Sequence, residues 1–423
     1  MKFAHLADCH LGAWRQPELN HLSLEIFSRA IDTCIKEKVD FVLIVGDLFD
    51  TAMPSIDSLK TAAEKFRQLK EQSIECFIIQ GSHDYSLSGK SMISVLEKAG
   101  LCMDLTNLEE HGRTIIKKIG NEKIFLAGIA GKKGSLEQQE ILEMKPYFME
   151  LSNKIQMLKK QEPLTTILLL HSTVSELLSS ELSNVHMKSI SLNDLPQGFD
   201  YYALGHIHNP AVYESNNMLA AYTGELFPSN FSEMESAQFG NFLIIEKNSD
   251  KIMSSNIRQM SLNTNNVVPL LIDANNESPA SLLDKILHEL RKYNLKDSII
   301  ALRIYGILAS GKPSEFDFNY IEQFARENGA YSILKNTFQL SSKEFEQFLE
   351  LKEHDKSIEE LEEESLLASI KENIISGAEK EKILKLIKIF DRDKDESETT
   401  FVFSSRLSKD VFNLLNLEGE NDN

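Results

Sequence analysis

The sequence predicts an α/β protein: a layered αββα sandwich, followed by a small α+β unit and a C-terminal helical segment. Three observations support this prediction. Short apolar runs alternate with helical patterns from the N-terminus, and an apparent hairpin at 114–128 departs from strict alternation. The polar run from Asn263 to Asn266 marks a boundary before a compact β-α-β-α-β pattern. Residues 341–423 are rich in Glu, Lys, Leu and Ile at helical spacing.

Apolar spacing places the strands and helices of the first part, residues 1–262. The run from Phe41 to Val45 is apolar throughout, which is typical of a strand buried on both faces. The other strands are expected at 2–7, 75–79, 114–119, 123–128, 165–170, 199–204, 218–223, 241–246 and 252–257. Helices are expected at 23–38, 56–72, 89–99 and 135–161.

The second part, residues 266–340, is expected to form the small α+β unit. Its strands are expected at 267–273, 298–305 and 330–337, and its helices at 279–293 and 315–328. From residue 341 onward the chain carries 12 basic and 22 acidic side chains, so a solvated acidic helix or tail is the simple interpretation. Apolar positions such as Phe345, Leu366 and Phe390 favour a segment that binds a partner instead.

Composition limits the classes of protein to which this chain can belong. The chain has 423 residues, a net charge of −19 and 42% hydrophobic residues, which excludes a disordered or fibrous chain. No run approaches the roughly eighteen apolar residues of a membrane span, and the N-terminus lacks a secretory pattern. The four cysteines form no C-x-x-C pair. We therefore expect a cytoplasmic protein with no membrane partner. The acidic total alone disfavours a nucleic-acid partner, but over half of it lies beyond residue 340.

Asp and His residues gather where predicted strands end. The five segments are Asp8-Cys9-His10, Gly46-Asp47-Leu48-Phe49-Asp50, Gly81-Ser82-His83-Asp84, His171-Ser172 and Gly205-His206-Ile207-His208. Any one of them alone is more often a satisfied polar group than a ligand. Their joint occurrence is different, because ligands of layered α/β proteins bind at the carboxyl ends of strands.

The residue types suit a site with two metal ions. Carboxylates and imidazoles are ligands for Mn²⁺, Fe or Zn²⁺, and two such ions can clamp a phosphate and supply hydroxide near neutral pH. One carboxylate must bridge the ions, and Asp47 is the best candidate because it follows a buried strand and a glycine. The alternation of an extended segment puts His206 and His208 on the same side.

The order of these motifs resembles the calcineurin-like metallophosphoesterases. Within that superfamily, D-C-H-L-G, G-D-L-F-D and Y-Y-A-L-G-H-I-H look like the SbcD-type (meiotic-recombination-eleven) nucleases of DNA double-strand-break repair. The resemblance implies a nuclease core at 1–262, a capping, DNA-binding domain at 266–340 and a helical region at 341–423. It also implies an exonuclease on double-stranded DNA and an endonuclease on single-stranded DNA, with a two-metal-activated hydroxide as nucleophile.

The resemblance further implies a role for each site residue. Two divalent ions, with Mn²⁺ the favoured metal, would be bound at two positions. The first position would use Asp8, His10, Asp47 and His208. The second would use Asp47, Ser82, His171 and His206. Ser82 stands where the superfamily usually has Asn, so it either ligates weakly or leaves the place to water.

The remaining implied roles are catalytic or supporting. His83 would protonate the leaving oxygen, and Asp84 would orient it. Asp50 is expected behind the ligands, at a place where several relatives carry His.

Partners also follow from the resemblance. The helices near 56–72 and 89–99 would form a homodimer bundle, with ordinary packing on the sheet as the equal alternative. Residues 341–423 would bind the coiled-coil base of an ABC-type repair ATPase, and DNA would be the substrate. By analogy the source is prokaryotic and the protein is DNA-associated. Two other functions stay open: a small-molecule or phosphoprotein metallophosphoesterase, and a non-enzymatic scaffold with a degraded metal site.

Overall fold

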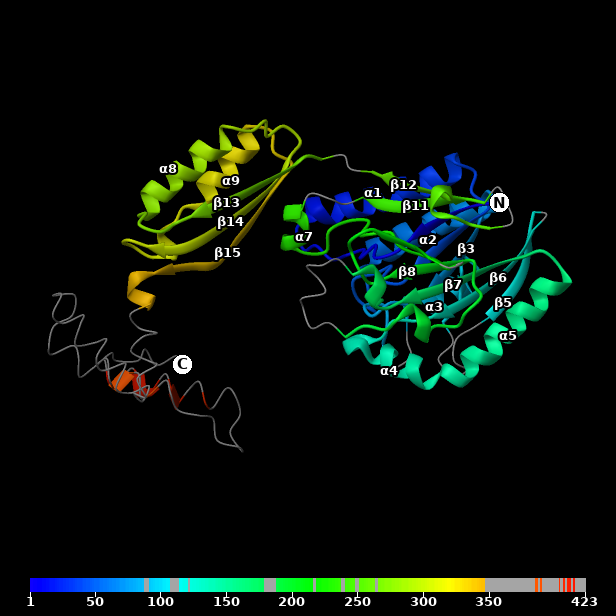
Figure 1. Ribbon diagram of the computed structural model, residues 1–423. Helices are drawn as coiled ribbons and strands as arrows, with labels where there is room; N and C mark the ends of the chain where they lie inside the picture. The colour runs from blue at the N-terminus through cyan, green and yellow to red at the C-terminus, as the bar shows by residue number, and fades with distance from the viewer. Residues whose placement is uncertain are drawn as a thin grey trace, which may run out of the picture. The chain divides into compact units, whose positions relative to one another are not determined.

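The computed structural model describes most of the chain up to residue 346. The described ranges are 1–86, 91–106, 114–120, 122–178, 188–215, 218–236, 240–247, 251–262 and 265–346, with single residues among 385–414. Its strands form two six-stranded sheets and one three-stranded sheet (Figure 1). Most of the C-terminal region 341–423, and with it the predicted partner-binding segment, lies outside the described residues.

The first sheet has the strand order β12-β11-β1-β2-β3-β4. Its strands are β1 (Lys2–Leu6), β2 (Phe41–Val45), β3 (Glu75–Ile79), β4 (Met103–Asp104), β11 (Asn241–Glu246) and β12 (Ile257–Ser261). Strands β1 to β4 pair in parallel, with Phe3 opposite Phe41, and β11 joins β1 antiparallel. Because β1, β2 and β3 run in one direction, their carboxyl ends meet at one edge.

The second sheet has the strand order β5-β6-β7-β8-β10-β9. Its strands are β5 (Thr114–Ile119), β6 (Glu122–Ile129), β7 (Leu164–His171), β8 (Tyr201–Gly205), β9 (Ala211–Ser215) and β10 (Met218–Tyr222). Strands β6, β7, β8 and β10 are parallel, and the hairpin partners β5 and β9 form antiparallel edges.

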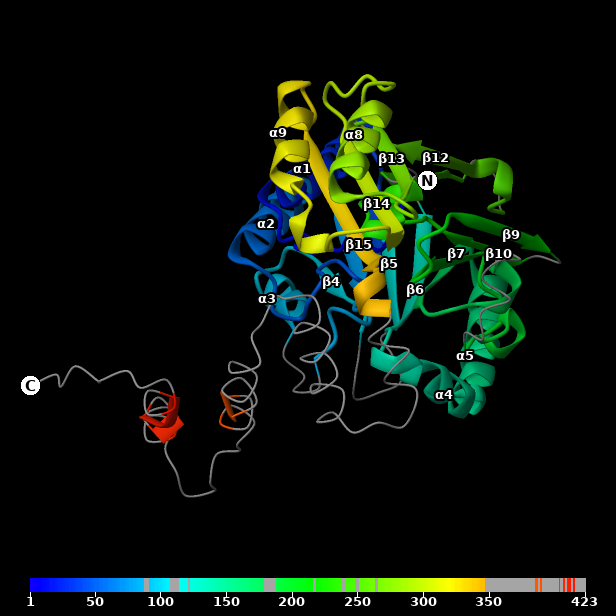
Figure 2. The ribbon, with the colours of Figure 1, turned by 90° about the vertical axis from the view of Figure 1, so that its left-hand side faces the viewer.

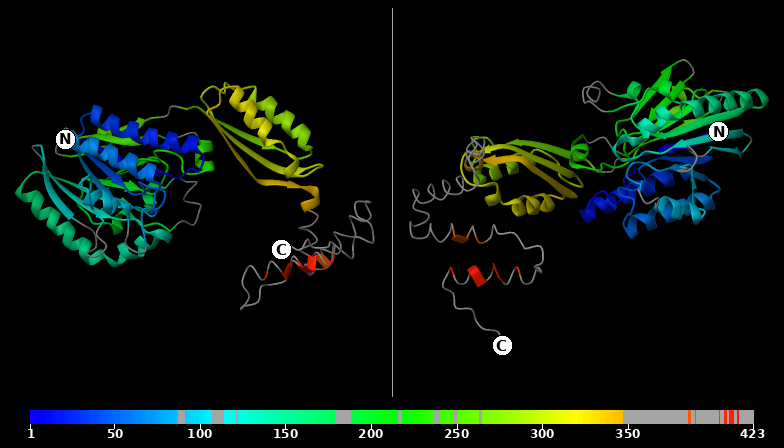
Figure 3. Two further views of the ribbon diagram at one scale, coloured as in Figure 1. Left: turned by 180° about the vertical axis from the view of Figure 1, so that it is seen from behind. Right: turned by 90° about the horizontal axis from the view of Figure 1, so that it is seen from below.

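Helices cover the outer face of each sheet, which confirms the predicted αββα layering (Figure 3). Helices α1 (Pro17–Lys36), α2 (Ile56–Glu71) and α3 (Met92–Lys98) pack on the first sheet, and α4 (Leu136–Glu143) and α5 (Lys145–Gln161) pack on the second. Between the two sheets lies a third apolar cluster, in which Phe3 and Phe41 stack with ring centroids 4.9 Å apart. Burial of this kind is the main stabilising term of a layered fold.

Strands β13 (Val267–Asp273), β14 (Ile299–Leu308) and β15 (Ser332–Ser342) form the third sheet in that order. Helices α8 (Pro279–Leu290) and α9 (Phe318–Glu327) lie side by side on one face of it (Figure 2). This is the β-α-β-α-β pattern expected from the sequence. The chain forms two compact units, one of residues 1–272, 283–304 and 317–338, the other of 273–282, 305–316 and the described residues from 339 onward. The division into parts at residues 262 and 340 stays a prediction.

Four details of the predicted elements need correction. The helix expected at 135–161 is two helices, because Pro146 has no N–H to continue α4 into α5. The first helix begins earlier, at Pro17, whose fixed φ suits a first helical position. The strand expected at 252–257 is instead β12 at 257–261, and β9 was missed. Both β9 and β12 are edge strands in which no residue is fully buried, so their apolar pattern is weak.

Shorter elements complete the described chain. Helix α7 (Phe231–Ser236) follows the second sheet, and 3-10 turns lie at Lys133–Ser135, Ser175–Leu177, Leu192–Asp194, Ser254–Asn256 and Pro313–Glu315. No helix within the described ranges is both long and apolar enough to span a membrane.

The apolar side chains of α2 and α3 pack mainly inside the chain. Phe66, Leu69, Ile93 and Leu96 are all buried in the cluster between these helices and the first sheet. Ile56, at the start of α2, and Val95, on α3, are the exceptions, at 84% and 51% exposed. Packing against the first sheet therefore accounts for most of the apolar side chains of these two helices. The homodimer stays a proposal.

A buried polar pair links the two sheets. His5 on β1 and Tyr201 on β8 are both fully buried, and His5 Nδ1 lies 2.9 Å from the Tyr201 hydroxyl. Burial lowers the pKa of His5 to about 3 from its usual 6.5. The unfolded chain therefore binds a proton more readily than the folded chain between these two values, and the folded state loses stability as the pH falls through that window.

We predict that His5→Gln makes unfolding less sensitive to acid. Between pH 7 and pH 5, the wild-type free energy of unfolding should fall by about 2 kcal/mol more than that of the variant. Urea unfolding followed by the fluorescence of Trp14, the one tryptophan of the sequence, measures this difference. Tyr201→Phe keeps His5 and should keep the wild-type acid sensitivity. Parallel pH profiles for wild type and His5→Gln would contradict the assignment.

Candidate metal centre

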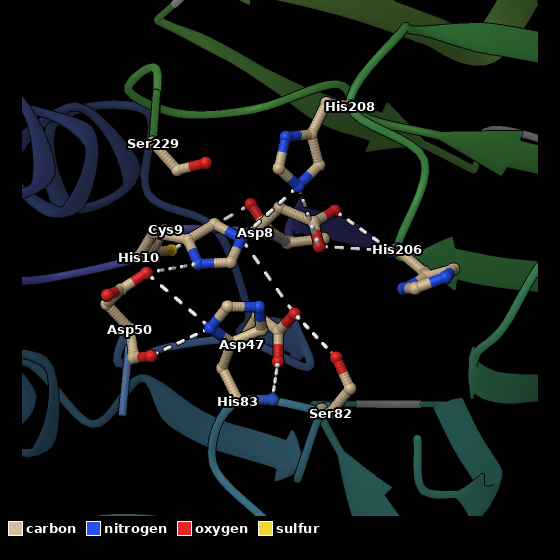
Figure 4. A network of polar contacts seen from close by, with 12 residues as sticks. Asp8, Cys9, His10, Asp47, Asp50, Ser82, His83, His206, His208 and Ser229 are labelled. Atoms are coloured by element: carbon tan, nitrogen blue, oxygen red, sulfur yellow. Dashed lines mark hydrogen bonds and ion pairs between the residues drawn. The ribbon is translucent and has the colours of Figure 1, made fainter. Parts of the chain in front are cut away.

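The predicted site residues lie together at the carboxyl ends of parallel strands. Asp8 and His10 follow β1, and Asp47 follows β2. From the second sheet, His171 ends β7, and His206 and His208 follow β8. Ser82, His83 and Asp84 follow β3, at the same edge of the first sheet. Figure 4 shows Ser82 and His83 beside Asp47. Both sheets thus contribute side chains to one cluster.

The first donor group consists of Asp8, His10 and His208. One ligand atom of each lies within 4.8 Å of the others. The Nε2 atoms of His10 and His208 are 3.2 Å apart, and His208 Nε2 is 3.9 Å from Asp8 Oδ1. Two imidazole nitrogens and a carboxylate oxygen that converge in this way can serve as ligands of one divalent ion.

The second donor group consists of Asp47, His171 and His206, whose ligand atoms also lie within 4.8 Å of one another. His171 Nε2 is 3.2 Å from Asp47 Oδ2, and its Nδ1 is 2.9 Å from the backbone oxygen of Val45. The backbone contact fixes the ring and leaves Nε2 pointing at the carboxylate. Asp47 also lies 3.8 Å from His10 Nε2, so it reaches the first group as well.

The backbone at these residues has an uncommon conformation. Asp8, His10, Asp47 and His206 have positive φ angles of 51°, 43°, 49° and 98°. Such angles cost free energy in residues other than glycine, and strain of this kind is concentrated at functional sites. Gly46, with φ of 81°, also needs to be glycine because a Cβ atom there would collide with the His171 ring. The tight turn after β2 therefore lets His171 approach Asp47.

Buried charges dominate the electrostatics of the cluster. Burial alone would lower the pKa of His171, but the Asp47 and Asp8 carboxylates raise it to about 9. Burial alone would raise the pKa of Asp47, yet the neighbouring His171 and His10 hold it far below its usual value. Burial and the charge of His171 together lower the pKa of His206 to about 4. A positive charge is thus favoured between the two aspartates.

The donor set fits divalent metal ions. His171 Nε2 is buried and, although it lies 3.2 Å from Asp47 Oδ2, it meets no hydrogen-bond geometry within the described part of the chain. A buried imidazole nitrogen without a hydrogen bond is costly unless another species satisfies it. Carboxylate and imidazole ligands from two adjacent groups suit Mn²⁺, Fe or Zn²⁺.

Ser82 lies beside the second donor group. Its hydroxyl donates to Asp47 Oδ2 at 3.4 Å, so its oxygen is near the carboxylate rather than remote from the site. The backbone N–H of the next residue, His83, donates to the other oxygen, Asp47 Oδ1, at 2.8 Å. The turn after β3 therefore fixes both oxygens of Asp47.

The predicted role of Asp84 needs correction. Its carboxylate is buried and accepts from the backbone N–H groups of Leu48, Phe49 and Gly81 at 3.0 to 3.1 Å. These bonds join the turns after β2 and β3. Burial and the nearby charge of Asp47 raise the pKa of Asp84 to about 7. Asp84 therefore supports the backbone and does not orient His83.

Asp50 orients His83 instead. The backbone oxygen of Asp50 lies 2.7 Å from His83 Nδ1, and its carboxylate oxygen lies 3.5 Å from the same atom. The same carboxylate is 3.3 Å from His10 Nδ1, so Asp50 contacts both imidazoles (Figure 4). A carbonyl oxygen can only accept, so His83 Nδ1 carries a proton and Nε2 faces away from it. The His83 side chain is 46% exposed, which leaves it accessible to a substrate.

Two carboxylates near His208 were missed at the sequence level. Glu225, after β10, and Glu233, on α7, lie 3.2 and 2.9 Å from His208 Nδ1. Burial raises the pKa of Glu225 to about 8, whereas the hydrogen bond and charge of His208 outweigh burial and hold the pKa of Glu233 low. Glu225 follows a predicted strand and a glycine, a signal that resembles Gly46-Asp47. Glu233 lies in a short helix and carried no signal.

The chain is similar in sequence to archaeal DNA repair proteins. The DNA double-strand break repair protein Mre11 of Archaeoglobus fulgidus is 31% identical over 228 residues, 53% of this chain and 50% of that protein. The protein of the same name from Methanocaldococcus jannaschii is 28% identical over 270 residues, 62% of this chain and 67% of that protein. The chain thus spans half to two thirds of the length of these relatives.

The chain is also similar to a solved structure and to a protein-family model. A dimetal phosphatase from Danio rerio superposes with a TM-score of 0.38 at 13% identity, covering 58% of this chain and 92% of that one. The calcineurin-like phosphoesterase family model matches residues 1–210, the range that contains both donor groups. Through these residues the chain belongs to the calcineurin-like phosphoesterase family.

Proposed function

We propose that this chain is a metal-dependent DNA nuclease of a double-strand-break repair complex. It would act as an exonuclease on double-stranded DNA and as an endonuclease on single-stranded DNA. One observation carries the proposal: two donor groups lie next to each other, with Asp47 of the second 3.8 Å from His10 of the first, at an edge where the His83 side chain is exposed. The names of the archaeal relatives support DNA as the substrate.

We assign the ligands from the two donor groups. Asp8, His10 and His208 would hold one ion, and His171 and His206 the other. Asp47 would bridge the ions, since its Oδ2 lies 3.2 Å from His171 and 3.8 Å from His10. When bound, two ions such as Mn²⁺ would supply a hydroxide nucleophile near neutral pH and neutralise charge on the phosphate.

The chain's own residues would then position the reaction. His83 has Nδ1 on the Asp50 backbone oxygen, so its Nε2 can reach a phosphodiester at the mouth of the site. A protonated Nε2 would donate its hydrogen to the departing sugar oxygen. Asp50 and the His10 ring, which packs edge-on at 4.7 Å, hold the His83 ring in place. No protein nucleophile is required.

Ser82 would make the second ion the more weakly held one. A neutral hydroxyl is a poorer ligand than the amide oxygen that the superfamily usually places there, and this hydroxyl already donates to Asp47. The first donor group has a carboxylate of its own in Asp8, whereas the carboxylate of the second group, Asp47, would be shared between the two ions.

The partners belong to the same proposal. Residues 341–423 would bind the coiled-coil base of an ABC-type repair ATPase, and a homodimer would form through exposed residues near α2 and α3. The exposed apolar side chains of Met53, Ile56 and Val95 are available for that contact.

The proposal predicts DNA cleavage by the full chain with Mn²⁺. The assay compares linear duplex DNA and circular single-stranded DNA with a chromogenic phosphodiester and a phosphomonoester. Cleavage of both DNA substrates, abolished by a chelator, is the expected outcome. Turnover of the small esters alone would favour a small-molecule or phosphoprotein phosphoesterase. Absence of metal binding in calorimetry would favour the scaffold.

We predict that His83→Ala keeps metal binding but lowers DNA cleavage by about a hundredfold or more, the size of a typical general-acid contribution. Metal affinity is measured by calorimetry and turnover by the DNA assay. His288→Ala, a change of an exposed histidine on α8, is the matched control and should leave both unchanged. Joint loss of metal binding and turnover would instead mean that His83 is a ligand or a structural residue.

We predict that Ser82→Asn tightens Mn²⁺ binding at the weaker site by about tenfold, roughly 1.4 kcal/mol, because an amide oxygen replaces a hydroxyl. A two-site fit of calorimetric titrations measures the change. Ser82→Ala removes the hydroxyl and serves as the control for the loss of the Asp47 contact. Equal weak-site affinities in all three proteins would show that position 82 is not near the ion.

A further inference from the structure

His208 is held from behind by a carboxylate whose two oxygens are both engaged. Glu233 Oε1 accepts a hydrogen bond from His208 Nδ1 at 2.9 Å. Glu233 Oε2 accepts from the backbone N–H and the hydroxyl of Ser229, at 2.7 and 2.9 Å. The His208 ring therefore has a single orientation, with Nε2 directed at His10 and Asp8.

Glu225 approaches the same nitrogen but does not replace this bond. Nδ1 of His208 carries one hydrogen, and the geometry of a hydrogen bond is met only toward Glu233. The nearer oxygen of Glu225, Oε2, is buried and accepts no hydrogen bond from the described residues.

Helix α7 carries Glu233 and is anchored on another side by Arg303 of β14. The Arg303 guanidinium donates to both oxygens of Glu235, with Nη2 to Oε2 at 2.6 Å and Nε to Oε1 at 3.0 Å. It also lies over the Phe231 ring at 5.0 Å and donates to the Ser232 hydroxyl at 3.3 Å. All of these residues belong to one compact unit.

The contacts made by Arg303 matter because α7 is short. A helix of six residues has few internal hydrogen bonds and depends on contacts outside itself. Met234 is the buried apolar residue of α7. The bidentate contact between Arg303 and Glu235 fixes the position of the helix more precisely than a single charge would.

We propose that Glu233 is a positioning residue for His208, and that Arg303 acts through α7 to hold Glu233 in place. The inference rests on the proposed role of His208 as a metal ligand. A carboxylate behind a ligating histidine fixes the ring and makes it a stronger donor, and loss of such a group typically weakens metal binding 10- to 100-fold. Metal affinity at the first donor group would therefore depend on a side chain of the third sheet.

The experiment measures Mn²⁺ affinity of the full chain by calorimetry, without a substrate. Glu233→Ala should weaken the tighter site about tenfold or more, and Glu233→Gln, which keeps an acceptor oxygen, should weaken it less. Arg303→Ala should weaken it several-fold, and Arg303→Lys should restore only part of the affinity. Arg258→Ala is the matched control, since it removes an exposed arginine that pairs with Glu37 and should change nothing.

A double-variant cycle tests the connection. If Arg303 acts through Glu233, Arg303→Ala should add nothing in the Glu233→Ala background. Additive losses would overturn the role of Arg303, and wild-type affinity in Glu233→Ala would overturn the role of Glu233. Should an alanine variant fail to fold, Glu233→Gln and Arg303→Lys make the same comparison. His208→Ala tests the proposed function separately from the role of Glu233. Unchanged Mn²⁺ binding in this variant would refute the assignment of His208 as a ligand.

Discussion

The structure depends most on the burial of two carboxylates, Asp8 and Asp47, around His171. Neither side chain is more than a few per cent exposed, and an uncompensated buried charge would cost several kcal/mol. His171 lies 3.2 Å from Asp47 and 3.9 Å from Asp8, and the backbone N–H groups of His83 and His206 donate to the two aspartates. These contacts come from the ends of five different strands, so the two sheets must face each other in one register for the charges to be balanced.

That requirement explains the unusual backbone around the cluster. Positive φ angles at Asp8, Asp47 and His206 turn each carboxylate or N–H inward immediately after its strand ends. Gly81 belongs to the same arrangement, because a Cβ atom there would collide with Asp47. The apolar cluster between the sheets supplies the stabilisation that offsets this local strain. A site that binds cations is thus assembled at a cost in local stability that the packed layers offset.

Much of this could be predicted from the sequence. Continuous apolar runs such as Phe41 to Val45 identify buried parallel strands, and polar residues directly after such runs identify the ends that meet. The prediction for Asp84 was wrong because a sequence does not tell which backbone N–H groups surround a carboxylate. Glu233 was missed because it lies 25 residues from His208 on a short helix, where no periodicity links the two. The sequence pattern therefore identifies site residues that directly follow strands. It does not identify the side chains of other elements that hold those residues in place.

The net charge of −19 is compatible with a polyanionic substrate when its distribution is considered. About half of the excess lies beyond residue 340, in a region proposed to meet a protein. At the site, Asp8 and Asp47 are covered by imidazoles and buried, so they contribute little repulsion at the surface. Two bound dications would make the local field positive where a phosphate enters, since bound ions are the largest charges in such a site. Affinity for DNA would then come from the metal centre, from the proposed second copy and from the proposed ATPase partner, and it would weaken as salt concentration rises.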